Sequence, residues 1–514
     1  MTDYSEFQPI NIHCRGGLVL DKSPQDVPKG AATQLQNMEP EIEGGYKRLD
    51  GFSKYSTSTL TGSGAVLGIA FLGSSVIGCR GDNVEYGTGT TWTSITGART
   101  SAGKYLFDNY NWTGTEILVM VSGQAGTNPA ATWDGSSYVL LNGAIGAGSG
   151  TAPTNPTCVK EFRDHLFLGQ DKTLHFTAPN DANDFTAGNG AGEITIPETI
   201  VNLAAFRDTL YVFAKNSIYK ITGSDLSTFV MAPVSNNIGC TSAWSVQEIG
   251  GDVIFLAPDG LRTIAGTEKL DDVELGTISK AVQPRINDIT SFDDVSSMVV
   301  RRKSQYRLWY PSSGVALPAT MGLLGALIRQ TTDNTPEQSI GWEWADLRGM
   351  RPSYASSGFL GTAETFLHGG WTDGIIYKQE QADEGDFDGT AIVARYQTPH
   401  YDFGDVGIRK TGQRLISTVA YTGNATITAR VIYDYNISTT PQPATYTLTG
   451  FASTTYGTGV YGTDTYGTGL PIWNRQSIEG SGFVVAVRFE HSTANVKAFS
   501  IKSFQLEILP GGRR

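Results

Sequence analysis

Three recurring aspartates are the first candidates for chemistry in this sequence. Asp164, Asp208 and Asp252 are separated by equal steps of 44 residues, and each precedes an apolar stretch. Converging carboxylates could exchange protons with a substrate or bind a cation. Equivalent positions of a repeat are spread around a fold, however, and Asp at a strand entrance commonly accepts hydrogen bonds from nearby backbone N–H groups. We therefore expect these aspartates to cap turns, and the adjacent Arg163 and Arg207 to be structural.

The other residue types that carry catalysis or bind metals show no matching pattern. The six histidines never occur as H-E-x-x-H, and the sequence contains neither a P-loop nor a G-x-S-x-G motif. The acidic run "DEGDFDG" (383–389) lacks the full spacing of an EF-hand, so we interpret it as a solvated loop. The four cysteines form no C-x-x-C pair. The sequence predicts no catalytic residues, no cofactor and no metal site, and hence a protein that is not an enzyme.

A tyrosine repeat is the one motif that suggests a contact surface. The stretch "YGTGVYGTDTYGTG" places Tyr456, Tyr461 and Tyr466 five residues apart, which fits neither a helix nor a strand. Glycine-rich loops with tyrosine suit contact surfaces, because tyrosine offers a large rigid area at low entropy cost. The three tyrosines are therefore predicted to contact a partner protein or a glycan, unless the segment is a self-packed hairpin tip.

The aspartates belong to an internal repeat of strands and turns. "FRDHLFLGQDKTLHF" aligns with "FRDTLYVFAKNSIYKI" when Asp164 is placed on Asp208, and "GDVIFLAPDGLRTIAG" follows as a third copy. Each copy contains an apolar strand, a polar turn and a second apolar strand. Weaker copies begin at four further residues: Ser74, Thr115, Ser304 and Glu364. The total is six or seven copies.

The repeat predicts a ring of small sheets. Consecutive apolar residues such as Leu210 to Phe213 indicate strands that are buried on both faces. Units of about 40–50 residues with several strands are typical of β-propeller blades, whereas an antiparallel solenoid needs polar caps that the end copies lack. We predict a mainly β protein with a six- or seven-bladed β-propeller-like domain over residues 56–389.

Two further segments flank the predicted propeller. Residues 1–55 are rich in Gly and Pro and read as an extended N-terminal arm, with one possible short helix at "GAATQLQNM" (30–38). Residues 390–514 contain five runs that alternate apolar and polar side chains, such as "ATITARVIYDYN". A period of two describes strands with one buried face, so this segment predicts a C-terminal β-sandwich-like domain.

Charge and hydropathy exclude several classes of function. The chain has 514 residues, with 38 basic and 50 acidic side chains, and its net charge of -12 argues against a surface that grips nucleic acid. No apolar run reaches the length of about 18–20 residues that spans a bilayer. The N-terminus "MTDYSEFQPI" has no secretory signal pattern, so we expect synthesis in a cytoplasm.

The order of these parts resembles the tail nozzle proteins of short-tailed bacteriophages, also called tail hub or DNA-stabilisation proteins. The resemblance is carried by "VKEFRDHLFLG", "VNLAAFRDTLYVFAKNSIYKITG", "ARYQTPHYDFGDVGIRKTGQRL" and "FVVAVRFEHSTANVKAFSIKSFQLEIL". It implies a structural virion protein that is assembled in the host cytoplasm into the phage tail. Six copies would form a ring below the portal and the adaptor, continue the channel for double-stranded DNA, retain the genome and seat fibres or a tail tip.

The net charge suits a channel through which DNA slides. Six copies would carry a formal charge of 6 × -12 = -72, and a wall with excess carboxylates would repel phosphates. The main alternative is a carbohydrate-binding or sialidase-like propeller. A sialidase-like hydrolase would show repeated S-x-D-x-G-x-x-W turns, of which "VEYGTGTTW" and "GGWTDGIIY" are only degenerate versions.

Overall fold

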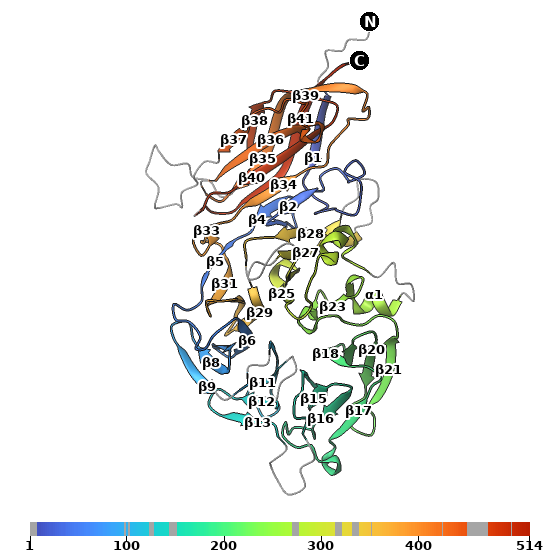
Figure 1. The fold of residues 1–514 in the computed structure, drawn as a ribbon, viewed down its shortest axis with the longest axis vertical. Coiled ribbons are helices and arrows are strands. Elements are labelled where there is room, and N and C mark those ends of the chain that lie inside the picture. The colour runs from blue at the N-terminus through green and yellow to red at the C-terminus, as the bar shows by residue number, and fades with distance from the viewer. Residues whose placement is uncertain are drawn as a thin grey trace.

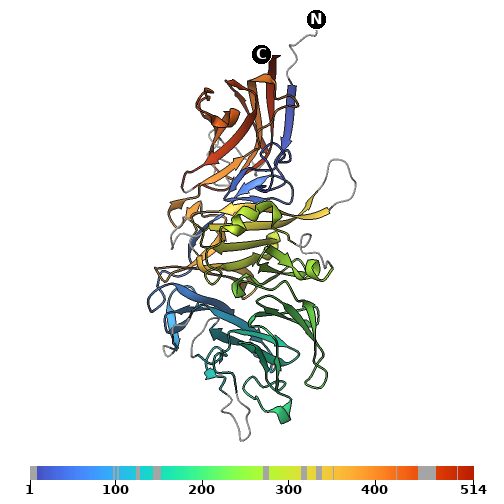
Figure 2. The same ribbon diagram turned by 45° about the vertical axis from the view of Figure 1, so that its right-hand side comes forward.

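Strands build two bodies that are stacked along the long axis of the protein (Figure 1). The computed structural model describes residues 8–513 except 97–98, 101–102, 123–127, 143–151, 270–276, 314–320, 331–338, 351, 424, 450–470 and 495. The lower body is a ring of small sheets seen along its axis, and the upper body is a pair of larger sheets. Figure 2 shows the same stacking from another side, with yellow strands between the two bodies.

Six small sheets form propeller blades; in the first five, neighbouring strands are consecutive in the chain, and in the sixth a strand from the N-terminal segment adds to three consecutive ones. The first blade consists of β6 (Val66–Leu72), β7 (Ser75–Arg80), β8 (Asn83–Gly87) and β9 (Trp92–Thr96). The second consists of β10 (Tyr105–Tyr110), β11 (Ile117–Ser122), β12 (Ala131–Trp133) and β13 (Tyr138–Leu140). The third consists of β14 (Cys158–Phe162), β15 (His165–Gln170), β16 (Thr173–Phe176) and β17 (Gly192–Thr195). The fourth and fifth are β18 (Ile200–Phe206), β19 (Thr209–Ala214), β20 (Ile218–Thr222) and β21 (Val230–Ser235); and β22 (Gln247–Ile249), β23 (Asp252–Ala257) and β24 (Gly260–Thr263). The sixth is β29 (Pro352–Leu360), β30 (Ala363–Gly370), β31 (Ile376–Gln381) and β5 (Gly51–Lys54), which β32 (Asp386–Phe387) and β33 (Thr390–Ala391) extend.

A larger sheet fills the remaining place in the ring. Its first four strands are β25 (Ser296–Val300), β26 (Gln305–Tyr310), β27 (Met321–Gln330) and β28 (Ser339–Leu347). The innermost strand β25 contacts β22 of the fifth blade and β29 of the sixth, and β29 contacts β6, so the ring closes. The predicted propeller of six or seven blades is thus confirmed: six blades are separate sheets, and one more place belongs to a shared sheet. The solenoid alternative is wrong.

The repeated sequence forms the second strand of each unit, where burial is greatest. All seven copies fall on second strands, namely β7, β11, β15, β19, β23, β26 and β30. In β15 and β19 five successive residues are buried, because each blade packs between two neighbours. The run of consecutive apolar residues that predicted burial on both faces therefore reflects this stacking.

In the described ranges, helical structure is confined to short segments between strands. The α-helices are α1 (Ile264–Lys269) and α2 (Gln283–Asn287), and the 3-10 turns are η1 (Ala187–Asn189), η2 (Ala243–Ser245), η3 (Lys280–Val282), η4 (Arg301–Lys303) and η5 (Asp434–Asn436). Among the described residues, no helix is long and apolar enough to span a membrane.

Two packed sheets form the upper body, which confirms the predicted β-sandwich-like domain. One sheet contains β3 (Met38–Pro40), β4 (Tyr46–Arg48), β41 (Phe499–Arg513), β35 (Ile408–Tyr421) and β38 (Pro471–Ser477), with β1 (Gln8–His13) on β41 and β39 (Ser481–Gly482) on β35. The other contains β2 (Gln34–Gln36), β34 (Ala394–Gln397), β40 (Val485–His491), β36 (Thr426–Tyr433) and β37 (Tyr446–Thr449). The rings of Phe489 and Phe504, one from each sheet, meet edge to face with centroids 5.5 Å apart.

The two bodies share one sheet through the three residues of β2. Gln36 pairs in parallel with Asp346 of β28, and the other edge of β2 pairs antiparallel with β34. The four propeller strands β25–β28 and the sandwich strands therefore belong to one nine-stranded sheet. Leu35 is fully buried in a hydrophobic cluster that extends from Leu256 in the fifth blade to Leu506 in the sandwich.

The predicted arm, residues 1–55, contributes strands to both bodies. β1 and β4 add to β41, whereas β5 pairs with β31 and completes the sixth blade. The short helix predicted at residues 30–38 is wrong, since this segment holds β2 and β3. Its helix-like composition is overridden because Leu35 fills the core between the bodies and Asn37 has a positive φ of 50°.

A buried network of charges connects the arm to the propeller. Arg307 of β26 donates to Glu380 of β31 at 2.6 Å and lies 3.5 Å from Glu39 of β3. Lys303 bridges the same two carboxylates, at 2.7 Å from Glu39 and 2.5 Å from Glu380. Burial alone would raise the pKa of Glu380, but Arg307 and Lys303 hold it well below its usual range. Each buried charge thus depends on its partners in another segment.

We predict that the substitution Glu380→Gln destabilises the protein by about 3 kcal/mol, because it leaves the buried Arg307 with Glu39 as its one ion-pair partner among the described residues and removes a carboxylate beside Lys303. The matched control is Asp383→Asn, which removes an exposed partner of Lys497 at 3.2 Å and should change stability by less than about 1 kcal/mol. Urea unfolding at neutral pH measures both effects. Equal effects of the two substitutions would contradict the importance of the buried network.

Candidate functional site

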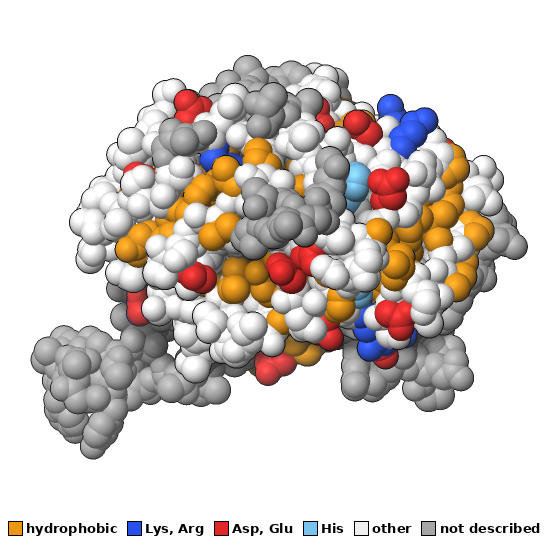
Figure 3. Space-filling view, turned by 90° about the horizontal axis from the view of Figure 1, so that it is seen from below, with side chains coloured by type: hydrophobic (Ala, Val, Ile, Leu, Met, Phe, Trp, Pro, Cys, Tyr) orange, Lys and Arg blue, Asp and Glu red, His pale blue; other side chains and the backbone are white. Residues whose placement is uncertain are grey.

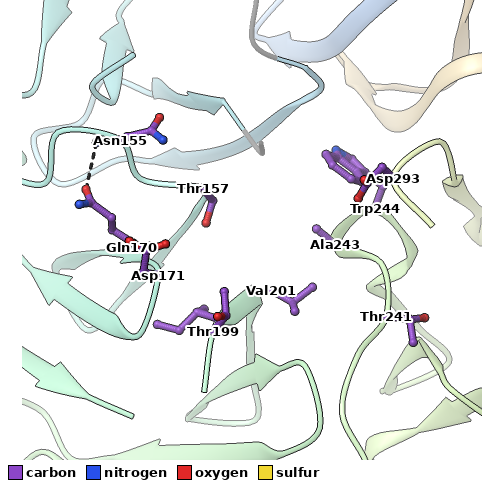
Figure 4. A pocket seen from close by; sticks show the side chains of 11 residues that line it. Asn155, Thr157, Gln170, Asp171, Thr199, Val201, Thr241, Ala243, Trp244 and Asp293 are labelled. Carbon is purple, nitrogen blue, oxygen red and sulfur yellow. Dashed lines mark hydrogen bonds between the residues drawn. The ribbon is translucent and has the colours of Figure 1, made fainter. Parts of the chain in front are cut away.

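A polar pocket lies at the propeller axis, where the inner strands begin. It has a volume of about 450 Å³. The lining residues lie at or just before the starts of inner strands, or at the end of a second strand, and they are Asn155, Thr157, Gln170, Asp171, Thr199, Ile200, Val201, Thr241, Ala243, Trp244 and Asp293. Figure 4 shows Asp171 and Asp293 on opposite sides, and the backbone N–H of Asn155 donates to the Gln170 amide oxygen at 2.9 Å. Successive blades repeat the same order of strands, so the starts of their inner strands lie near one another around the axis.

The side chains of this pocket have structural partners. The hydroxyls of Thr157 and Thr241 donate to the backbone carbonyls of Gly169 and Leu256, at 3.3 Å and 3.0 Å. The two carboxylates come from opposite walls. Amide and hydroxyl groups of this kind can hydrogen-bond a small polar ligand, but a nucleophile held by a base is not found among the described lining residues.

A lysine and a tryptophan close the axis beside this pocket. The Lys104 ammonium donates to the carbonyl of Val295 at 2.9 Å and lies 5.3 Å from the centroid of the Trp244 ring. The indole N–H of Trp244 donates in turn to the carbonyl of Tyr105 at 3.2 Å. Lys104 and Tyr105 lie at the start of β10 in the second blade, and Trp244 lies just before β22 in the fifth blade. These contacts therefore cross the middle of the ring.

The position of Lys104 weakens its positive charge. Burial lowers the pKa of Lys104 to about 7, although the nearby Asp293 and Asp294 act to raise it. A lysine with such a pKa is partly neutral at physiological pH, as in catalytic lysines. Here the amine is buried and bonded to the backbone, so the contact across the axis, rather than nucleophilic attack, is its evident role.

A second cavity lies further along the same inner strands. Its volume is about 630 Å³, and its walls come from β6, β10, β14, β18, β22 and β29. Within it the Lys160 ammonium lies 2.5 Å from the Asp108 carboxylate, which also accepts the backbone N–H of Glu161 at 2.6 Å. Burial lowers the pKa of Lys160, but the attraction of Asp108 outweighs it and raises the pKa overall. This ion pair joins the second and third blades.

The structure separates the three recurring aspartates. Asp164 and Asp208 each take the second position of a two-residue hairpin turn, with φ values of 59° and 60°. In the fifth blade Gly250 and Gly251 form this turn, so Asp252 is the first residue of β23. The predicted alignment of Asp252 with Asp164 and Asp208 is wrong by one residue. The chain from the hairpin turn of the fourth blade to that of the fifth is one residue shorter than the chain from the third blade's turn to the fourth's.

These residues bind neighbouring turns, as was expected of structural groups. Arg163 lies 3.1 Å from the carboxylate of Asp208 in the next blade, and Arg207 donates to the carbonyl of Gly251 in the blade after it at 2.9 Å. The Asp252 carboxylate accepts the backbone N–H of Ala265 at 3.0 Å, near the start of α1. The hairpins are thus linked around the ring. In the described structure, only Asp252 of the three aspartates accepts hydrogen bonds from backbone N–H groups through its carboxylate.

The remaining sequence candidates are dispersed or lie outside the described residues. The described part of the chain contains no group of three or more His, Cys, Asp or Glu side chains that could hold a metal ion. In the acidic run, the Asp386 carboxylate accepts the N–H of Gly389 at 2.8 Å, while Asp383 points into solvent. Tyr456, Tyr461 and Tyr466 all lie in residues 450–470, outside the described residues.

Sequence reasoning missed Lys104 and Trp244. Neither belongs to a motif, and the burial of Lys104 comes from a tryptophan 140 residues later in the chain. Trp244 precedes the third strong copy of the repeat by a few residues, so its place beside an inner strand could have been inferred. The position of Trp244 on the propeller axis could not have been inferred from the sequence.

Comparison with known proteins assigns the chain to no family. No protein family model matches the chain, and no curated protein matches it. Among solved structures, an ancestral GH74 enzyme aligns over 65% of this chain and 53% of its own, with 9% identity and a TM-score of 0.40. The designed Ika8 protein aligns over 63% and 99%, with 12% identity and a TM-score of 0.35. This chain spans only 40% of an extracellular domain of a two component system from B. thetaiotaomicron, with 12% identity and a TM-score of 0.38.

We predict that Lys104→Met removes a pH dependence of stability. In the wild type, Lys104 binds its proton less tightly when folded than when unfolded, so its contribution to stability rises between about pH 7 and pH 10. The difference in unfolding free energy, variant minus wild type, should fall by about 2 kcal/mol between pH 7 and pH 9. Urea unfolding at both pH values measures it, and a constant difference would contradict the lowered pKa.

Proposed function

We propose that this chain is a structural subunit of a short-tailed phage tail. Six copies form a ring that extends the DNA channel below the portal and the adaptor, retains packaged DNA and seats fibres or a tail tip. The resemblance in the order of arm, propeller and sandwich supports this proposal, and the mainly β architecture agrees with it. Double-stranded DNA passes through the ring without sequence-specific binding.

The observation that carries the proposal is the shared sheet between the two bodies. Backbone hydrogen bonds run from β25 in the propeller through β2 to β37 in the sandwich, and a buried charge network supports the same junction. A two-domain enzyme that closes on its substrate needs a hinge at such a junction. A junction made of continuous sheet and core suits a subunit that keeps its shape under load.

Exposed apolar side chains support contacts with neighbouring molecules. In the sandwich Ile42 is 74% exposed, and in the propeller Val230 and Phe359 are 61% and 55% exposed. The lower end of the propeller shows hydrophobic side chains gathered in patches between scattered acidic ones (Figure 3). Larger exposed apolar areas commonly mark interaction sites, and a ring subunit needs two such sites for its neighbours.

We predict that the purified chain forms closed rings with a mass of about 331 kDa, six times 55.2 kDa. Native mass spectrometry gives the number of copies, and negative-stain microscopy shows the ring and its channel. A monomer of 55.2 kDa at every concentration that hydrolyses glycosides would contradict the proposal and favour the sialidase-like alternative. A predominantly basic channel wall would contradict the charge argument.

A further inference from the structure

The outer face of one sandwich sheet carries a trough with an unusual set of side chains. The sheet order places β38 and β1 on the outside and β35 and β41 between them. The trough has a volume of about 540 Å³, within the range of about 300–1,000 Å³ that is typical of ligand sites. Its lining includes Trp473, whose side chain is 78% exposed. This site is separate from the propeller axis.

Strand register arranges the trough in two rows across the sheet. The first row is Trp473, Thr418, Ser503 and His13, and the second is Arg475, Ile416, Gln505 and Asn11. The residues on the outer strands are exposed and form two walls, whereas those on β35 and β41 are half-buried and form the floor. Three steps between strands separate the walls by about 14 Å.

The protein leaves the polar groups of this trough without partners. Seven of the eight side chains can hydrogen-bond, and in the described structure none of the seven has a side-chain hydrogen bond or an ion pair with another residue. The next row of the same face differs, because Arg414 there lies 3.3 Å from the Glu507 carboxylate. The two rows therefore offer a set of free donors and acceptors beside one exposed indole ring.

We propose that this trough binds an oligosaccharide that carries a carboxylate. The apolar face of a sugar ring can stack on Trp473, while its hydroxyls can bond the amide and hydroxyl groups of the floor. Arg475 has no carboxylate among its seven neighbours in the two rows, and its planar guanidinium suits a bidentate bond to a uronate or sialate. Trp and Arg are also enriched in protein interfaces, so a second copy of the chain is the competing occupant, which the test below distinguishes. The proposal does not rest on ring formation.

Affinity electrophoresis of the full-length chain tests the proposal. Native gels contain hyaluronan, polygalacturonate or colominic acid, and control gels contain dextran or dextran sulfate. We expect at least one of the three acidic polysaccharides to retard the wild type with at least tenfold higher apparent affinity than dextran, and more strongly than dextran sulfate. Trp473→Ala should abolish this retardation, and Arg475→Gln should reduce it to the level in dextran.

Two matched variants control for unspecific effects. Arg414→Gln removes a paired arginine from the same face, and Phe292→Ala removes an exposed aromatic ring from the propeller; both should bind as the wild type does. Thermal melts check that Trp473→Ala and Arg475→Gln remain folded, as expected for exposed sites. The proposal is overturned if none of the three polysaccharides retards the wild type, if dextran sulfate acts equally, or if Trp473→Ala keeps binding. It is also overturned if Trp473→Ala changes the oligomeric state instead.

Discussion

The three-residue strand β2 is the constraint on which the rest of this structure depends. It is bonded on one edge to the propeller strand β28 and on the other to the sandwich strand β34. A short strand with both edges used cannot shift its register without breaking two ladders at once. Leu35 adds a buried side chain to the hydrophobic cluster on both sides of this junction. The relative position of propeller and sandwich is therefore set by backbone geometry and not by a flexible linker.

Charges and hairpins then fix the neighbouring parts. The network of Arg307, Lys303, Glu39 and Glu380 binds the arm to two adjacent places of the ring. Around the ring, Arg163 and Arg207 link the hairpin of one blade to that of the next. Lys104 and Trp244 connect opposite blades across the axis. Each contact joins segments that local sequence alone would leave independent.

Much of the fold could be predicted because its signal is local and repeated. Buried second strands appear in the sequence as apolar runs. The solvent-facing side of the sandwich appears as an alternation of buried and partly exposed side chains along β36 and β40. The role of residues 8–54 could not be predicted, because the partners of β1 and β5 are distant in sequence and short strands have weak patterns. The one-residue error at Asp252 arose because Gly250 and Gly251 replace an Arg-Asp turn. The axial site and the trough depend on side chains that only the closed ring and the strand register bring together, so no motif marks them.

The pairing of β1 with β41 has a consequence for how the chain is made. Ile12 lies opposite Phe504, so the first strand is synthesised 492 residues before its partner. At about 5–20 residues per second, a ribosome needs roughly 25–100 seconds to cover that distance. Throughout that time the edge of β1 lacks its native neighbour, and this sheet of the sandwich can close only after β41 has been synthesised. The propeller strands precede β41 in the chain, so the propeller can form while β1 still waits for its partner to leave the exit tunnel.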